Sequence, residues 1–264
     1  MRFEVQGRSV FAATGGRPFE PALPALVFLH GAGMDHSVWS LQSRYFSHHG
    51  YGVLALDLPG HGKSQGPALG TIAAMGEWVR ACLDSLGVAR ANLVGHSMGA
   101  FVALEIAGLA PERVATSALL GVAARMPVHP ELLAAARENR HLAPELITAW
   151  GYGRAAHLGG NPVPGLWMTG GGLSLLERSQ AGALASDLEA CNVYDGEAAA
   201  RRVRGPTLLL LGGDDRMTPP AKAAPLLAAM PQARQVVLPV GHMLMIERPD
   251  AVTDALRDFL AARK

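Results

Sequence analysis

Short apolar runs that alternate with longer amphipathic segments constrain the fold of this chain more than any other feature. Most of the runs are apolar throughout, which is typical of strands covered on both faces in a parallel sheet. They are ALVFLH (25–30), GVLALDL (52–58), NLVGHS (92–97), VATSALLG (114–121), PTLLLLGG (206–213) and ARQVVLP (233–239). The first sixteen residues instead alternate polar and apolar side chains, which predicts a β-hairpin.

The segments between these runs have apolar residues at helical spacing and Gly or Pro at their ends. They include IAAMGEWVRACLDSLG, AFVALEIAGLAPE, PAKAAPLLAAM and PDAVTDALRDFLAARK. Strands and helices in alternation predict an α/β fold with right-handed crossovers. The chain has 264 residues, 49% of them hydrophobic, so it can bury one large core.

One long stretch, residues 123–202, interrupts this alternation. It contains no convincing strand, only helical segments and the loop GGNPVPGLWMTGGG. A helical insertion of this kind is predicted to cap the carboxyl edge of the sheet, where open α/β sheets bind their ligands. We therefore expect an α/β core formed by residues 1–122 and 203–264, and a helical cap formed by residues 123–202.

Charge and composition exclude several classes of partner. Lys and Arg number 23 and Asp and Glu 22, so the formal charge of +1 predicts no binding to nucleic acid or to an anionic membrane. No apolar stretch is long enough for a transmembrane helix, and the N-terminus lacks the pattern of a secretory signal. We expect a cytoplasmic protein that acts on a small molecule; nothing in the sequence indicates its oligomeric state.

A serine between two glycines is the strongest candidate for chemistry. Gly95-His96-Ser97-Met98-Gly99 fits the pattern G-x-S-x-G, and it ends a predicted strand and opens a predicted helix. This context is that of a nucleophile elbow, in which the serine hydroxyl stands exposed at the top of the sheet. The alternative is an ordinary glycine-rich turn between a strand and a helix.

A serine hydroxyl needs a base to take its proton and a third group to orient that base. His242 follows the last predicted strand and precedes the last helix, which puts it at the same sheet edge as Ser97. Two adjacent acids, Asp214 and Asp215, follow the preceding strand. Asp215 is favoured because its spacing to Pro219 matches a loop that leads into the next helix, and Asp214 is then a solvated turn residue.

Five motifs resemble, in the same order along the chain, the landmarks of the α/β-hydrolase superfamily. They are LHGAG (29–33), DLPGHGKS (57–64), VGHSMGA (94–100), GGDDRMTP (212–219) and GHMLMIERPD (241–250). The resemblance covers nearly the whole chain. It implies an eight-stranded, mostly parallel sheet with a helical cap inserted after the sixth strand, and it places Ser97, Asp215 and His242 on the family's catalytic triad.

Acyl transfer also needs hydrogen-bond donors for the negatively charged oxygen of the tetrahedral intermediate. By position, the backbone N–H of Met98 supplies the first donor. The second is expected from the loop His30-Gly31-Ala32-Gly33, from the N–H of Ala32. Small residues in this loop allow the backbone to approach the substrate closely.

No cofactor or metal site is expected. Gly31-Ala32-Gly33 lacks the third glycine of a dinucleotide fingerprint, and Gly62-Lys63-Ser64 lacks the leading glycine of a phosphate loop. The histidines of the cap do not have metal-ligand spacing. The two cysteines, Cys82 and Cys191, form neither a disulfide framework nor a metal cluster, and both are expected to be buried.

Large side chains in the predicted cap are candidates for a substrate pocket, since small-molecule sites are mostly apolar. The equally plausible alternative is that they only pack the cap on the core. They are Trp150, Tyr152, Leu166, Trp167 and Met168.

We interpret the sequence as a serine hydrolase that cleaves small neutral esters or lactones through an acyl-enzyme on Ser97. Neutral substrates are expected because no basic cluster lies near the predicted site, and Arg216 is expected to face solvent. Alternatives on the same triad are a carbon–carbon bond hydrolase or a perhydrolase. A slow-turnover ligand-binding or sensing protein with this fold is the alternative outside enzymes.

Overall fold

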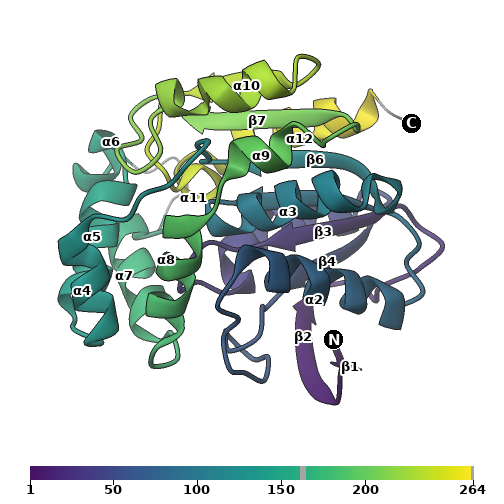
Figure 1. The fold of residues 1–264 in the computed structure, drawn as a ribbon, viewed down its shortest axis with the longest axis horizontal. Helices are drawn as coiled ribbons and strands as arrows, with labels where there is room; N and C mark the ends of the chain where they lie inside the picture. The colour runs from purple at the N-terminus through teal and green to yellow at the C-terminus, as the bar shows by residue number, and fades with distance from the viewer. Residues whose placement is uncertain (161–164, 263–264) are drawn as a thin grey trace.

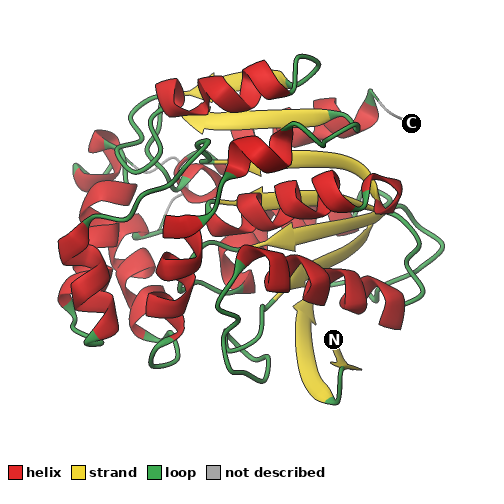
Figure 2. Ribbon diagram, in the orientation of Figure 1, coloured by secondary structure: helices red, strands yellow, loops and turns green. Residues whose placement is uncertain are grey.

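Eight strands form one sheet in the order β1-β2-β4-β3-β5-β6-β7-β8 in the computed structural model, which describes residues 1–160 and 165–262 (Figure 1). The helices lie on both faces of this sheet (Figure 2), which confirms the predicted α/β class. The strands are β1 (Arg2–Val5), β2 (Arg8–Ala13), β3 (Ala25–Leu29), β4 (Gly52–Leu56), β5 (Ala91–His96), β6 (Val114–Leu120), β7 (Thr207–Gly212) and β8 (Arg234–Leu238).

Strand direction sets where a site can form. β1 and β2 make an antiparallel hairpin that joins β4 antiparallel, whereas all pairs from β4 through β3, β5, β6 and β7 to β8 are parallel. The carboxyl ends of these six parallel strands therefore meet at one edge. Every residue of β3 is buried, with Leu26 and Phe28 facing one layer of helices and Val27 and Leu29 facing the other. Burial on both faces explains why this strand is apolar throughout.

Two layers of helices cover the sheet. One layer and its core cluster contain α2 (Ile72–Ser85), α3 (Met98–Leu109), α9 (Gly196–Ala200), η3 (Pro220–Ala223) and α10 (Ala224–Ala229). The opposite layer contains η1 (His36–Trp39), α1 (Ser40–Ser47), α11 (Leu244–Glu247) and α12 (Pro249–Ala261). A short helix, η2 (Pro111–Arg113), leads into β6. Both cysteines are free and buried in the first layer's core.

Helices follow one another between β6 and β7, with no strand among the residues described there. Before α9 they gather at the end of the sheet toward which the arrows of the parallel strands point (Figure 1). α9 itself packs on α3, where a Cβ on Gly108 would lie 2.9 Å from the Ala199 carbonyl oxygen. The helices before α9 are α4 (Pro130–Arg137), α5 (Leu142–Gly151), α6 (Arg154–His157), α7 (Met168–Glu177) and α8 (Ala183–Val193).

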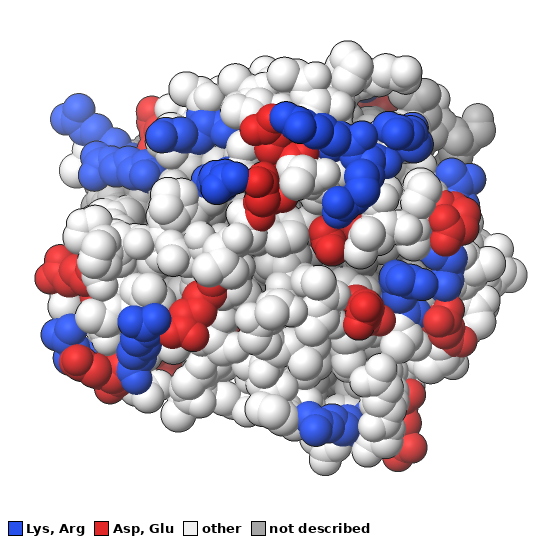
Figure 3. Space-filling model, viewed as in Figure 1, with Lys and Arg blue, Asp and Glu red and all other residues white. Residues whose placement is uncertain are grey.

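Charges of both signs are interspersed on the face seen in Figure 3, and much of its centre is uncharged. Within residues 1–160 and 165–262, no helix combines the length and the apolar character that crossing a membrane requires.

Candidate active site

The turn between β5 and α3 holds Ser97 in a conformation that few residues adopt. Its φ is 53° and its ψ is −115°, a strained combination for a residue with a side chain. A Cβ on Gly95 would overlap the carbonyl oxygen of Gly99, and a Cβ on Gly99 would overlap that of Leu29. Both glycines are therefore required sterically, because backbone passes within contact distance on each side of the serine.

Asp215, in the loop after β7, is hydrogen-bonded to His242. Its Oδ2 accepts from His242 Nδ1 at 2.8 Å and from the Thr218 hydroxyl at 2.7 Å, and its Oδ1 accepts two backbone N–H groups, those of Met217 and Thr218. Burial alone would raise the pKa of Asp215, but the neighbouring His242 and these hydrogen bonds hold it well below its usual range. The carboxyl of Asp214, by contrast, is exposed.

Hydrogen bonds and one close packing contact position the ring and backbone of His242. Because Nδ1 donates to Asp215, Nε2 of the neutral ring carries no proton and is free to act as an acceptor. The His242 N–H donates to the Gly151 carbonyl at 2.6 Å, and Nε2 of the buried His96 donates to the His242 carbonyl at 2.9 Å. Gly121 packs against the ring, since a Cβ there would lie 3.0 Å from Nδ1.

The two proposed oxyanion donors have no acceptor within the described residues. Met98 is the first residue of α3, so its N–H has no partner in the helix. The Gly31 carbonyl accepts from His30 Nδ1 at 2.9 Å and from the Met34 N–H at 3.2 Å. Because a trans peptide is planar, these bonds direct the N–H of Ala32 to the opposite side. The pKa of His30 is lowered to about 4 by burial, so the ring is neutral at physiological pH.

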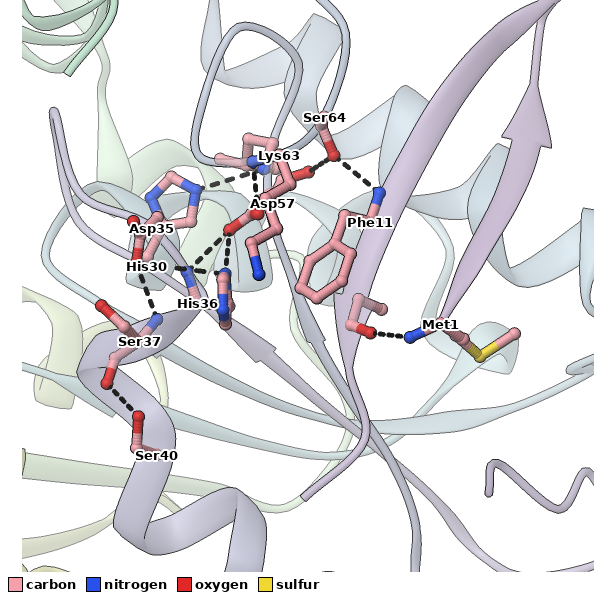
Figure 4. Close-up of polar contacts among 12 residues, drawn as sticks. Met1, Phe11, His30, Asp35, His36, Ser37, Ser40, Asp57, Lys63 and Ser64 are labelled. Atoms are coloured by element: carbon pink, nitrogen blue, oxygen red, sulfur yellow. Dashed lines mark hydrogen bonds and ion pairs between the residues drawn. The ribbon is translucent and has the colours of Figure 1, made fainter. Parts of the chain in front are cut away.

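A buried carboxylate, Asp57, organises the loop that supports His30 (Figure 4). Its Oδ1 accepts from the backbone and ring of His36 at 2.7 and 2.8 Å, and its Oδ2 accepts from the Lys63 N–H at 2.8 Å. The next residue, Leu58, donates its N–H to His30 Nε2. Asp35, His36 and Asp57 bring possible metal ligands together. Since both Asp57 oxygens already accept protein N–H groups, we assign this group a structural role.

Asp187 of α8 connects the helices after β6 to the loop that carries Ala32. Its Oδ2 accepts the Gly33 N–H and His61 Nε2, each at 2.8 Å, and Asp187 and His61 are both buried. His61 Nδ1 faces the Pro59 carbonyl at 3.0 Å, so both ring nitrogens are donors and the ring is cationic. Burial lowers the pKa of His61, but the Asp187 charge and hydrogen bond outweigh burial, and the net shift is upward.

A cavity of about 430 Å³ lies beside Ser97 and His242. Ser97, His242 and Ala32 line it together with residues of the helices that follow β6. Of the five cap residues predicted near the substrate, Trp150 lines this cavity. Most of its other lining side chains are apolar, among them Met126, Leu132, Ile147, Leu188 and Met243.

The other four predicted cap residues are absent from the described lining of this cavity. Tyr152 is buried against α7, where a Cβ on Gly172 would overlap its hydroxyl. Met168 is buried in the core, whereas Leu166 is exposed and Trp167 is 76% exposed. Hydrophobicity alone could not separate these positions, because each depends on how the helices and the loops between them pack on the core.

Several residues at the site were not anticipated from the sequence. Thr218 bonds to Asp215, and Arg216, expected to face solvent away from the site, is exposed and also lines the cavity. Both lie within three positions of Asp215 in the sequence, and this closeness is the signal that could have identified them. Asp187 offers no such signal, since it lies 126 positions from His61 within a helix.

Comparisons with known proteins agree with this geometry. Residues 26–255 match the alpha/beta hydrolase family. A dihydrolipoyllysine-residue acetyltransferase component of the acetoin cleaving system of Pseudomonas putida is 32% identical over 97% of this chain and 68% of its own length. The (E)-2-((N-methylformamido)methylene)succinate hydrolase of Acinetobacter baylyi is 30% identical over 89% of each chain. The enol-lactonase structure from Burkholderia xenovorans superposes with a TM-score of 0.89 and 28% identity, over 99% of this chain and 100% of that one.

Proposed function

The chain belongs to the alpha/beta hydrolase family, and on that basis we propose that it cleaves small carboxylic esters or lactones through an acyl-enzyme on Ser97. One observation carries this proposal: the Asp215–His242 hydrogen bond adjoins a cavity that Ser97 and His242 both line. The similarity to an enol-lactonase supports an ester-type bond as the target. The enzyme is a hydrolase, and we propose that the bond it cleaves is that of an ester or a lactone.

In the proposed reaction, His242 Nε2 takes the Ser97 proton while Oγ bonds to the substrate carbonyl carbon. The carbon–oxygen bond to the leaving group then breaks, and His242 gives the proton to the departing alkoxide. Water repeats the sequence, which releases the acid and returns the proton to Ser97. The N–H groups of Ala32 and Met98 stabilise the oxyanion of both steps, and each such donor is worth about 3 to 4 kcal/mol.

We further propose that the helical segment between β6 and β7, residues 123–202, acts as a cap that closes the substrate cavity. Trp150 and Leu132 of this segment line the cavity, which supports that role. The C-terminal part of the segment also contributes to the core layer, because α9 packs on α3.

The expectation of neutral substrates rested on the lack of a basic cluster near the site, and in particular on a solvent-facing Arg216. Since Arg216 lines the cavity, that reason for excluding acidic substrates no longer holds. Carbon–carbon bond cleavage on the same triad releases a stabilised carbanion, typically from a dienolic keto-acid. An assay panel for this enzyme therefore includes acidic esters and a dienolic keto-acid beside neutral esters.

The nucleophile is tested by Ser97→Ala with Ser85→Ala as the matched control, since Ser85 is an exposed serine on α2. We expect Ser97→Ala to lose roughly 10⁶-fold in kcat on 4-nitrophenyl esters, and Ser85→Ala to retain wild-type turnover. A phosphonate inhibitor should label the wild type and Ser85→Ala, but not Ser97→Ala. Full activity in a folded Ser97→Ala enzyme would refute the mechanism.

A further inference from the structure

The cavity beside Ser97 has an uneven charge distribution. Its described lining is mainly apolar and includes no Asp or Glu, and Arg216 is the one residue of this lining with a permanently charged side chain. A cation beside apolar walls attracts an anion more strongly than it would in open water, because fewer water molecules screen the interaction. The charge of the lining therefore favours a substrate that carries a negative group.

Arg216 has a fixed backbone and an unpaired side chain. The residues on either side of it are held together, since Asp215 Oδ1 accepts the N–H groups of Met217 and Thr218 at 2.8 Å. Arg216 is exposed, and its guanidinium forms no hydrogen bond or ion pair with another described residue. Arginines elsewhere do find acids, as Arg113 does with Asp84 at 2.6 Å.

From these observations we propose that Arg216 binds a carboxylate on the substrate, so that the preferred substrates are monoanionic esters or lactones. A guanidinium matches a carboxylate with two parallel hydrogen bonds, and it stays charged at all physiological pH values. The apolar walls hold the chain between the carboxylate and the scissile carbonyl. This inference rests on the proposed function and names the substrate class of the same site.

The test compares two 4-nitrophenyl esters: 4-nitrophenyl hydrogen glutarate, which carries a free carboxylate, and methyl 4-nitrophenyl glutarate, in which a methyl group neutralises that carboxylate. We expect the wild type to prefer the acid at least roughly tenfold in kcat/KM, which corresponds to about 1.4 kcal/mol. Arg216→Gln should abolish this preference mainly through KM, and Arg216→Lys should retain part of it. Lys222→Gln is the matched control, because Lys222 is an exposed cation six positions away that does not line the cavity.

Two results, one with the wild type and one with Arg216→Gln, would overturn the proposal. One is a wild-type enzyme that hydrolyses both esters equally well. The other is an Arg216→Gln variant that loses the same factor on both esters, which would mean that Arg216 acts through the adjacent Asp215 and His242. A loss of preference in Lys222→Gln would likewise refute an assignment to Arg216, and would indicate that the electric field of several surface charges causes the preference for the acid.

Binding without turnover separates this proposal from the proposed function. Glutarate binding to the folded Ser97→Ala enzyme, measured by calorimetry, should weaken at least roughly tenfold when Arg216→Gln is added. If the wild type hydrolyses neither ester but the binding result holds, the ester chemistry is wrong and the carboxylate site stands. If Arg216→Gln does not weaken binding, the carboxylate site is wrong whatever the enzyme hydrolyses.

Discussion

Replacing Asp187 with Asn tests whether the buried contact between α8 and the loop that carries Ala32 stabilises the fold. One oxygen, Asp187 Oδ2, accepts both the Gly33 N–H and His61 Nε2. Asn presents either an amide oxygen or an NH₂ group at that position. If the amide oxygen takes this position, the cationic His61 has no counter-ion. If the NH₂ group takes it, two hydrogen-bond donors, this group and the Gly33 N–H, face each other. Neither orientation preserves both contacts.

The expected loss is large because both partners are buried. Removing one member of a buried ion pair costs about 3 to 5 kcal/mol in the free energy of unfolding. For a chain of this length, such a loss lowers Tm by roughly 6 to 20 °C, at about 2 to 4 °C per kcal/mol. We also expect kcat to fall, since the Gly33 N–H contact holds the loop that carries the Ala32 donor.

The loss should depend on pH in a defined direction. The pKa of His61 is higher in the folded state than its ordinary value of about 6.5. Its pairing with Asp187 therefore contributes fully below about pH 6.5, and the contribution disappears as the pH rises through the raised pKa of the folded state. The difference in stability between wild type and Asp187→Asn should be greatest near about pH 6 and should shrink at alkaline pH.

Urea unfolding of the full chain at acidic and alkaline pH measures the loss in the free energy of unfolding and its dependence on pH. Glu189→Gln is the control, because Glu189 lies on the same helix and pairs with Arg137 at 2.7 Å in an exposed position. That pair should contribute less than about 1 kcal/mol. The reasoning fails if Asp187→Asn destabilises no more than Glu189→Gln, or if its effect is equal at the two pH values.

Two further predictions concern catalysis and the cap. Asp215→Asn should lower kcat by roughly 10⁴-fold while Asp214→Asn has little effect, because Asp215 is the acid that bonds to His242; steady-state kinetics giving equal losses would refute this. Trp150→Ala should change the chain-length preference of kcat/KM from acetate to octanoate esters, by about 1 to 3 kcal/mol per methylene contact, and Trp167→Ala should not. A similar change in both variants would contradict the assignment of Trp150 to the cavity.

The sequence alone determined the α/β class and the positions of the central strands. The run at residues 25–30 became β3, and the run at 206–213 contains β7. A strand buried on both faces must be apolar at every position, so its pattern is visible locally. The glycines around Ser97 are visible for a similar reason: a turn this tight excludes side chains wherever backbone passes close to it.

The tertiary structure alone decided which cap residues face the cavity and which distant polar groups meet. Trp150 and Trp167 are equally large and apolar in the sequence, yet one lines the cavity and the other is 76% exposed. Trp150 lies within α5 and Trp167 directly precedes α7, and which of them points inward depends on how these helices dock, which hydrophobicity does not encode. Asp187 likewise meets His61 only after α8 packs against the core. Contacts across such a sequence separation arise from the packing of whole elements, which no local pattern of residues specifies.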